Sequence, residues 1–170
     1  MLVFLLTFQV QAQALLTQEN DFLKTALYYE NLIKTEKFKS LISDELFPKL
    51  NKKVLVVHFW STTCPSCLSE LNSIGEFIKR NSSKVEFIGI HAVDFSDKNQ
   101  QQKISSIKAF IKKNDLKMNV SYDQNAKATG LFHVESLPTT FTFVNGKLFK
   151  IHDEAYGFVD KKYLKILNDI

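Results

Sequence analysis

The chain has 170 residues, of which 45% are hydrophobic and 24% are charged. This length and composition fit one globular domain with its own core and exclude a disordered or fibrous chain. The 22 basic and 18 acidic residues give a net charge of only +4 and form no single basic stripe, so we expect no nucleic-acid partner. Two cysteines are too few for a disulfide scaffold.

The N-terminal segment has the composition of an export signal. The first 18 residues contain no ionisable side chain, and Leu2–Phe8 is a short apolar run. A membrane-spanning helix needs about 20 apolar residues, so we expect no stable membrane insertion. The run is typical of a secretory signal with the small residues Ala12 and Ala14 as a cleavage site, although no Lys or Arg precedes it. We predict a signal peptide over residues 1–14 and a periplasmic or otherwise extracytoplasmic protein. A frayed hydrophobic N-terminus is the alternative.

Residues 15–51 are predicted to form an N-terminal extension packed on a domain that spans residues 52–170. Apolar residues in this extension recur at helical spacing, namely at Phe22, Ala26, Tyr29 and Ile33. The aromatic and β-branched content would also suit strands, so a helix and an irregular extension both stay open. A short helix is expected near Asp44–Leu50.

A strand followed by an amphipathic helix opens the domain. Val54–Trp60 is a continuous apolar run, which predicts a strand buried on both faces. After Cys67, apolar residues at three- and four-residue intervals predict a helix that ends near Arg80. Val85–Val93 is predicted to be the next strand.

Further elements follow at short intervals. Asp97 and Gln100, three residues apart, form the pattern of a capping box that opens a helix. The apolar face of this helix is predicted to comprise Ile104, Ile107 and Ile111. A short strand near Met118–Ser121 and a short helix around Ala126–Phe132 are expected next.

The C-terminal part predicts a hairpin and a last helix. Thr139–Val144 and Lys147–Ile151 are joined by Asn145-Gly146, the pair that a tight type I′ turn prefers. Asp160 is expected to cap a helix that continues through Leu167. This alternation of strands and helices predicts an α/β fold, a sheet covered by helices on both faces.

Both cysteines lie in Cys64-Pro65-Ser66-Cys67, between the predicted strand and the predicted helix. Two Cys separated by two residues in a first helical turn can close a small disulfide ring. Free N–H groups and the helix dipole would stabilise a thiolate at Cys64 and lower the pKa of its thiol. Such a thiolate attacks a partner disulfide, and Cys67 then resolves the mixed disulfide. Pro65 suits an early helical position because its φ is fixed and it has no N–H.

A structural metal site and an inert structural role are the alternatives for the two cysteines. A single C-x-x-C is also half of a zinc site, but the chain has no second C-x-x-C, and its four His residues are not spaced as zinc ligands. If the cysteines were inert and structural, their position between the strand and the helix would be a coincidence. The strand-to-helix position favours redox chemistry, so we expect no metal and no cofactor.

The segment from His58 to Cys67, HFWSTTCPSC, resembles the thioredoxin active site F-W-x-x-x-C-x-x-C. Leu137-Pro138-Thr139-Thr140 is similar to the loop that carries a cis proline in that family. The resemblance covers about residues 52–170 and, with the signal-like start, points to the TlpA/ResA-like branch of extracytoplasmic thiol-disulfide oxidoreductases. It implies a thioredoxin-like fold, with a central mixed sheet of four to five strands and helices on both faces.

The resemblance implies a substrate-binding surface around the cysteines. Pro138 would be the cis residue that faces the disulfide, and Leu137 would offer backbone hydrogen bonds to a substrate strand. Without the C-x-x-C, Pro138 would be taken for an ordinary trans proline. Pro65 and Trp60 complete this set, and Trp60 is expected to pack beneath the active-site loop.

Two further residues become candidates for proton transfer. Glu70 matches the position where ResA-like proteins place a carboxylate beneath the disulfide, where it could exchange a proton with the second thiol. A solvated helix Glu is the alternative. His58 stands where thioredoxin has a buried Asp and could accept a proton, whereas a core His bonded to the backbone is the alternative.

We therefore expect an exported, monomeric thiol-disulfide oxidoreductase. It would act as a reductant on disulfide-bearing proteins, with cytochrome c apoproteins as one class that the family suggests, and a membrane-embedded thiol electron donor would maintain it. Two alternatives on the same fold are a peroxiredoxin-like enzyme and a copper carrier. A peroxiredoxin needs an Arg beside its nucleophile, and the only Arg of the chain is Arg80. Copper carriers of this fold use C-x-x-x-C.

Overall fold

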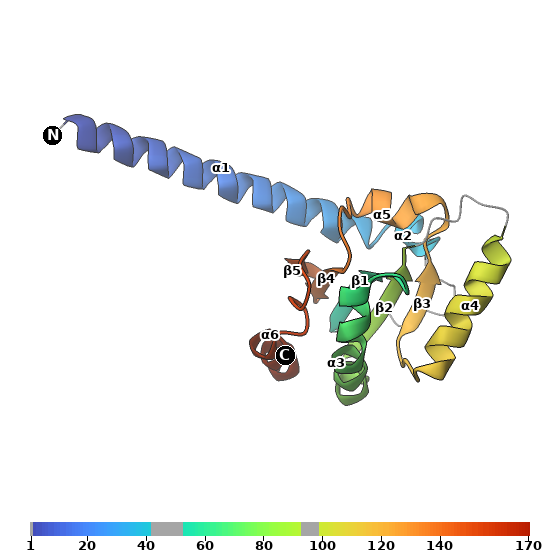
Figure 1. Ribbon diagram of the computed structural model, residues 1–170. Helices are drawn as coiled ribbons and strands as arrows, with labels where there is room; N and C mark the ends of the chain where they lie inside the picture. Colours follow the sequence, from blue (N-terminus) through green and yellow to red (C-terminus); the bar gives the residue numbers. More distant parts are fainter. Residues whose placement is uncertain (1, 42–52, 93–98) are drawn as a thin grey trace.

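The computed structural model describes residues 2–41, 53–92 and 99–170. Figure 1 shows a twisted sheet with helices around it and one long helix that extends away from the sheet. The predicted helix near Asp44–Leu50 and the predicted cap at Asp97 lie outside the described residues.

The sheet contains five strands: β1 (Val54–Trp60), β2 (Val85–His91), β3 (Asn119–Tyr122), β4 (Thr139–Val144) and β5 (Lys147–His152). Their spatial order is β3-β2-β1-β4-β5. β1 pairs in parallel with β2 and antiparallel with β4, so parallel and antiparallel halves meet at β1. Every residue of β1 is buried, as the unbroken apolar run predicts. The predicted mixed α/β sheet is confirmed.

Alternate residues of β1 serve two cores, because successive side chains of a strand point to opposite faces. One core joins Val54, Val56 and Trp60 to α3 (Pro65–Asn81) and α6 (Lys161–Asp169), and α4 (Gln100–Lys113) packs against it through Phe110. The other core contains the remaining apolar side chains of β1, which are Leu55, Val57 and Phe59. Those side chains pack against α1 (Leu2–Leu32), α2 (Glu36–Lys39) and α5 (Lys127–Leu131).

The C-terminal hairpin and cap follow the sequence closely. Asn145 and Gly146 have φ angles of 50° and 74°, the positive values that a type I′ turn requires. The carboxylate of Asp160 accepts hydrogen bonds from Lys162 N and Tyr163 N, and so caps α6. The N-cap residue of α4 is Asn99.

The C-terminal end of α1, from Ala26 onward, is part of the domain core. Ala26, Tyr29, Leu32 and Ile33 are buried in the cluster that covers one face of the sheet. Tyr29 donates a hydrogen bond of 2.9 Å to the buried carbonyl of Phe132. Glu30 accepts a hydrogen bond of 3.2 Å from Leu148 N on the edge strand β5. Of the two alternatives for residues 15–32, the helix is therefore the observed one.

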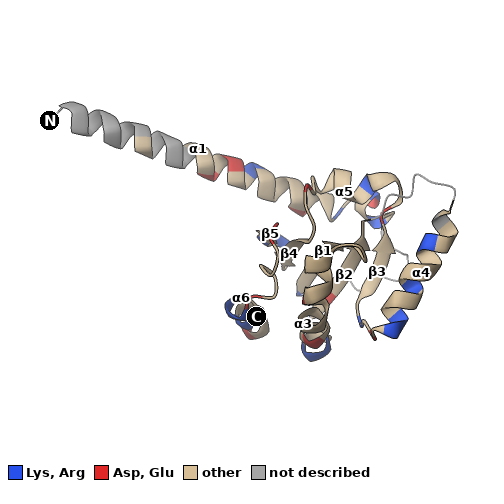
Figure 2. Ribbon diagram, viewed as in Figure 1, with Lys and Arg blue, Asp and Glu red and all other residues tan. Residues whose placement is uncertain are grey.

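The charged residues are distributed over several elements. Figure 2 shows basic residues along α4, on α6 and at the end of α3 that lies away from the long helix. Within the described residues, none of the helices combines the length and the apolarity that a membrane-spanning segment needs.

Candidate active site

The two cysteines form a disulfide at the N-terminus of α3. Their sulfurs are 2.10 Å apart and their Cα atoms 5.3 Å apart. Cys64 is the N-cap residue, and Pro65 occupies the first helical turn as predicted. Cys67 is fully buried, whereas Cys64 is only half-buried. Cys64 is therefore the sulfur that a partner molecule can reach.

The surroundings of Cys64 Sγ favour a negative charge on that sulfur. The Cys67 N–H donates a hydrogen bond to it at 3.1 Å, and Ser66 Oγ lies 3.3 Å away. Both groups can donate to a thiolate, and the positive end of the α3 dipole adds to their effect.

A cis peptide bond joins Leu137 and Pro138 opposite the disulfide. The carbonyl oxygen of Leu137 lies 3.7 Å from Cys64 Sγ. The loop is fixed by Thr139, whose hydroxyl donates a hydrogen bond of 2.7 Å to Ser136 O. Leu137 is half-buried and Pro138 is buried. The structure thus brings together the two cysteines and the proline that the sequence singled out.

The turn that leads from β1 into Cys64 is held by side chains. Ser61 Oγ accepts a hydrogen bond of 3.1 Å from Thr63 N, and His91 Nε2 accepts one of 3.0 Å from Thr62 N. Burial lowers the pKa of His91 to about 4, so its ring is neutral and able to accept. Sequence reasoning did not assign His91 a role. Its position at the end of β2, the strand paired with β1, was the signal available.

Glu70 lies on the buried side of α3, about one helical turn beyond Cys67. It follows Cys67 by three residues, so both side chains share one helix face, and Glu70 is 1% exposed. Its Oε1 accepts a hydrogen bond from Tyr156 N, and Oε2 has no hydrogen-bond partner among the described residues. Burial raises the pKa of the Glu70 carboxyl, and the bond from Tyr156 offsets part of that rise. The solvated alternative for Glu70 is therefore wrong.

His58 is a second buried titratable group near the site. Its Nδ1 lies 2.8 Å from Thr140 Oγ1 on β4, and its Nε2 has no partner within the described part of the chain. Burial lowers the pKa of His58 to about 3, so the ring is neutral at neutral pH. The alternative prediction for His58, a core His bonded to the backbone, is not observed, because the partner of its Nδ1 is a side chain.

Trp60 requires a correction. Its side chain is 0% exposed, so it cannot contact a substrate directly, contrary to its place in the predicted substrate-binding set. The indole instead packs edge-on against His91, with ring centres 4.8 Å apart. Trp60 thereby packs against the ring that holds the turn at Thr62.

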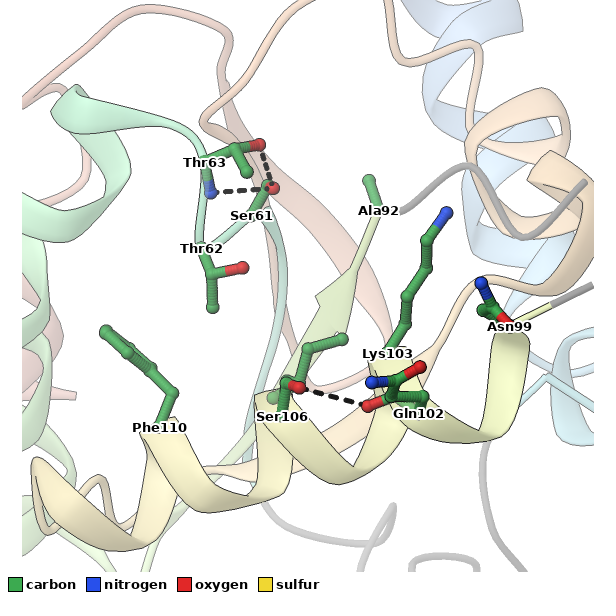
Figure 3. Close-up of a pocket in the computed structure, with 10 residues that line it drawn as sticks. Ser61, Thr62, Thr63, Ala92, Asn99, Gln102, Lys103, Ser106 and Phe110 are labelled. Atoms are coloured by element: carbon green, nitrogen blue, oxygen red, sulfur yellow. Dashed lines mark hydrogen bonds between the residues drawn. The ribbon is translucent and has the colours of Figure 1, made fainter. Parts of the chain in front are cut away.

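A pocket opens beside this turn. It has a volume of about 720 Å³, and hydroxyl groups of Ser61, Thr62 and Thr63 line one wall. Figure 3 shows α4 as the other wall, with Lys103 and Phe110 directed toward the space between. Among the described residues, no group of three or more His, Cys, Asp or Glu side chains is placed to hold a metal ion.

The sequence model of the AhpC/TSA family matches residues 34–151, more than half of the chain. The chain is 32% identical over 117 residues to the thiol-disulfide oxidoreductase ResA of Bacillus cereus, a match that covers 68% of this chain and 62% of that protein. It is 30% identical over 87 residues to the sporulation thiol-disulfide oxidoreductase A of Bacillus subtilis, covering 51% and 50% of the two chains. The matches thus span between half and two thirds of the length of these relatives.

Solved structures show the same fold. The crystal structure of StoA from Bacillus subtilis is similar with a TM-score of 0.53 and 25% identity, over 71% of this chain and 84% of that one. An exposed lipoprotein thioredoxin from Streptococcus pneumoniae is similar with a TM-score of 0.56 and 22% identity, over 72% and 87%. The predicted thioredoxin-like fold is confirmed.

Proposed function

The chain belongs to the AhpC/TSA family, and we propose that its Cys64–Cys67 pair makes it a thiol-disulfide oxidoreductase that acts on proteins. One observation carries this proposal: a half-buried Cys64 caps α3, is bonded to a fully buried Cys67 and faces the Leu137–Pro138 loop. The names of the two bacillar relatives support the same chemistry.

The reduced protein would transfer two electrons to a substrate disulfide. The Cys64 thiolate attacks one substrate sulfur, so a Cys64–substrate bond forms, the substrate disulfide breaks and the other substrate sulfur leaves as a thiolate that takes up a proton. Cys67 then loses its proton and attacks Cys64 Sγ. The Cys64–Cys67 disulfide forms, the mixed disulfide breaks and the second substrate sulfur leaves as a thiolate.

The proton of Cys67 needs an acceptor beneath the disulfide. Glu70 shares the buried face of α3 with Cys67, and its raised pKa makes the carboxylate a better base than an exposed Glu. His58 must take a proton against a pKa of about 3, so its expected role as a proton acceptor is the less favourable of the two. We assign the main proton exchange to Glu70.

Substrate contacts are proposed for the loop opposite the sulfurs. The resemblance to thioredoxins gives Leu137 backbone hydrogen bonds to an extended substrate segment, with Pro138 behind it. Pro65 is exposed beside Cys64 and completes the rim.

We further propose that the protein is exported and acts as a monomeric reductant in an extracytoplasmic compartment. The charge-free N-terminal segment with small residues at Ala12 and Ala14 supports export. A disulfide such as Cys64–Cys67 persists in an oxidising compartment. A membrane-embedded thiol donor would then return two electrons to the disulfide after each turnover.

The peroxiredoxin-like alternative conflicts with the position of Arg80. This residue lies near the C-terminal end of α3, 16 residues beyond Cys64, and pairs with Glu76 at 3.1 Å. At 1.5 Å per helical residue it is about 24 Å from the disulfide and cannot polarise a peroxide there.

Reduction of insulin disulfides tests the proposal. Wild-type protein with a dithiol donor should precipitate the insulin B chain, whereas Cys64→Ser, verified as folded by circular dichroism, should not. Glu70→Gln should retain the exchange but slow it at neutral pH, because the amide cannot take the Cys67 proton. Equal inactivity of folded wild-type and Cys64→Ser protein would refute the function.

A further inference from the structure

We propose that Tyr156, in the loop between β5 and α6, is the aromatic anchor on which a disulfide-bearing polypeptide docks beside Cys64. The inference rests on the proposed function and names the surface that distinguishes a protein substrate from a small disulfide. No sequence motif singled out Tyr156.

Tyr156 is the exposed aromatic residue of the loop, in which residues 153–156 are all exposed and Phe158 is buried. Its side chain is 56% exposed. Phe158, two residues later, is 1% exposed and packs edge-on against Phe77 and Phe87. The loop therefore buries one aromatic ring in the core and presents the other to solvent. Large aromatic rings held at a surface are the side chains that most often dominate the binding energy of protein interfaces.

The ring is fixed before any partner arrives. The Tyr156 N–H donates to the buried carboxylate of Glu70, and its phenol oxygen lies 3.0 Å from Ser69 Oγ. Its φ is 64°, a left-handed backbone conformation that few residues other than Gly, Asn and Asp adopt. An anchor that is ordered in advance loses less conformational entropy on binding.

The loop connects the two walls that flank Cys64. On one side, Tyr156 reaches Ser69, which stands one helical turn beyond Pro65. On the other side, Ser136 Oγ donates a hydrogen bond of 3.1 Å to Asp153 O, and Ser136 directly precedes the Leu137–Pro138 loop. From Cys64 to Ser69 the axial distance along α3 is about 8 Å, the span of two to three extended residues.

These positions define the partner. A polypeptide whose cysteine reaches Cys64 Sγ and whose chain continues along the first turns of α3 meets the Tyr156 ring. An extended segment with an apolar side chain two or three residues from its cysteine fits this surface. A small disulfide such as glutathione disulfide has too little chain beyond its sulfur to use the ring fully.

Tyr156→Asn is the informative variant. Asn tolerates a positive φ and keeps the N–H that Glu70 accepts, so the ring is removed while the loop is retained. Tyr156→Phe keeps the ring and removes the phenol contact with Ser69. Phe22→Gln serves as the matched control, because Phe22 is 60% exposed on α1, the helix that extends away from the sheet in Figure 1.

The measurement is kcat/KM for reduction of insulin and of glutathione disulfide by each reduced variant. In Tyr156→Asn we expect kcat/KM for insulin, divided by kcat/KM for glutathione disulfide, to fall about tenfold. That is the effect of losing an interface anchor. Tyr156→Phe should stay within about threefold of the wild-type ratio, and Phe22→Gln should match it.

Three results overturn the inference. Equal losses with both substrates in Tyr156→Asn would mean that the residue acts through the sulfurs or Glu70. An unchanged ratio would mean that the ring binds no polypeptide substrate. A change in molar mass between wild type and Tyr156→Asn in light scattering would identify a second copy of this chain as the partner. Inactivity of the wild type on both disulfides would instead refute the proposed function itself.

Discussion

Acid should destabilise the protein through buried histidines with lowered pKa values, above all His58 and His91. His58 and His91 are both 0% exposed, and burial lowers their pKa values to about 3 and about 4 from 6.5. Below pH 6.5 each of these two His residues is protonated in the unfolded chain but stays neutral in the folded chain. The free energy of unfolding therefore falls as the pH falls from 6.5 toward those lower values.

The size of the effect follows from the two pKa values. Each pH unit in this window lowers the free energy of unfolding by about 1.4 kcal/mol per histidine. Between pH 7 and pH 4.5, His58 alone contributes a loss of about 3 kcal/mol, and His91 a slightly smaller one. Protonation of Glu70 works in the opposite direction, because its pKa is raised in the folded state. A comparison of variants removes that common contribution.

Urea unfolding of the oxidised protein at pH 7 and pH 4.5 measures the effect. In His58→Asn the amide can still bond Thr140 but does not titrate, so the loss between the two pH values should shrink by about 3 kcal/mol. His133→Asn is the control, since His133 is exposed and has a φ of 49° that Asn tolerates. Parallel pH profiles for wild type and His58→Asn would show that the folded state protonates His58 readily, contrary to this reasoning.

Three substitutions test the local architecture in urea unfolding at pH 7. Gly146→Ala should lower the free energy of unfolding by about 1 kcal/mol, because the turn needs a φ of 74° at that residue; no change would mean that the turn relaxes. Tyr29→Phe should lower it by about 1 kcal/mol, since the buried Phe132 carbonyl loses its donor, and an unaffected variant would place α1 outside the cooperative unit. Asp160→Ala should lower the free energy of unfolding by about 1 kcal/mol through loss of the α6 cap, whereas Asp160→Asn should retain most of the stabilisation by the cap.

The central elements could be predicted because local sequence and tertiary environment agree there. Val54–Trp60 is apolar throughout, and the strand it forms is covered by helices on both faces. Asn145-Gly146 has the backbone preference that closes a two-residue hairpin without strain. Cys64 and Cys67 were informative because their spacing, strand end and helix start point to one chemistry.

The remaining features depend on contacts between residues far apart in the chain. Glu70 looks like a surface residue in sequence, but in the fold it is buried and accepts a hydrogen bond from Tyr156 N, 86 residues further along. His91 gains its role from Thr62, 29 residues earlier. Helical spacing alone could not place the extension, since its buried face is defined by partners such as Phe132 and Phe141, which lie about 100 residues further along. A single sequence shows no such pairing.

The division of α1 into a long projecting part and a short core-packed end bears on the predicted signal peptide. The first buried side chain in the described part of α1 is Ala26, and Figure 1 shows the preceding turns extending away from the sheet. Cleavage after Ala14 would therefore leave every described core contact of the helix in place. The free energy of unfolding of a chain that begins at Leu15 should lie within about 0.5 kcal/mol of that of the full chain, as expected for the loss of an exposed segment.

Removal of residues 1–33 should have a far larger effect, because it deletes Ala26, Tyr29, Leu32 and Ile33 from the core. Loss of even two large buried side chains lowers the free energy of unfolding by about 4 kcal/mol or more. Urea unfolding of both truncated chains distinguishes the projecting part of α1 from its core-packed end. If the chain that begins at Leu15 were as unstable as the one that begins at Lys34, the projecting part would be needed for the fold, and a cleavable signal could not end at Ala14.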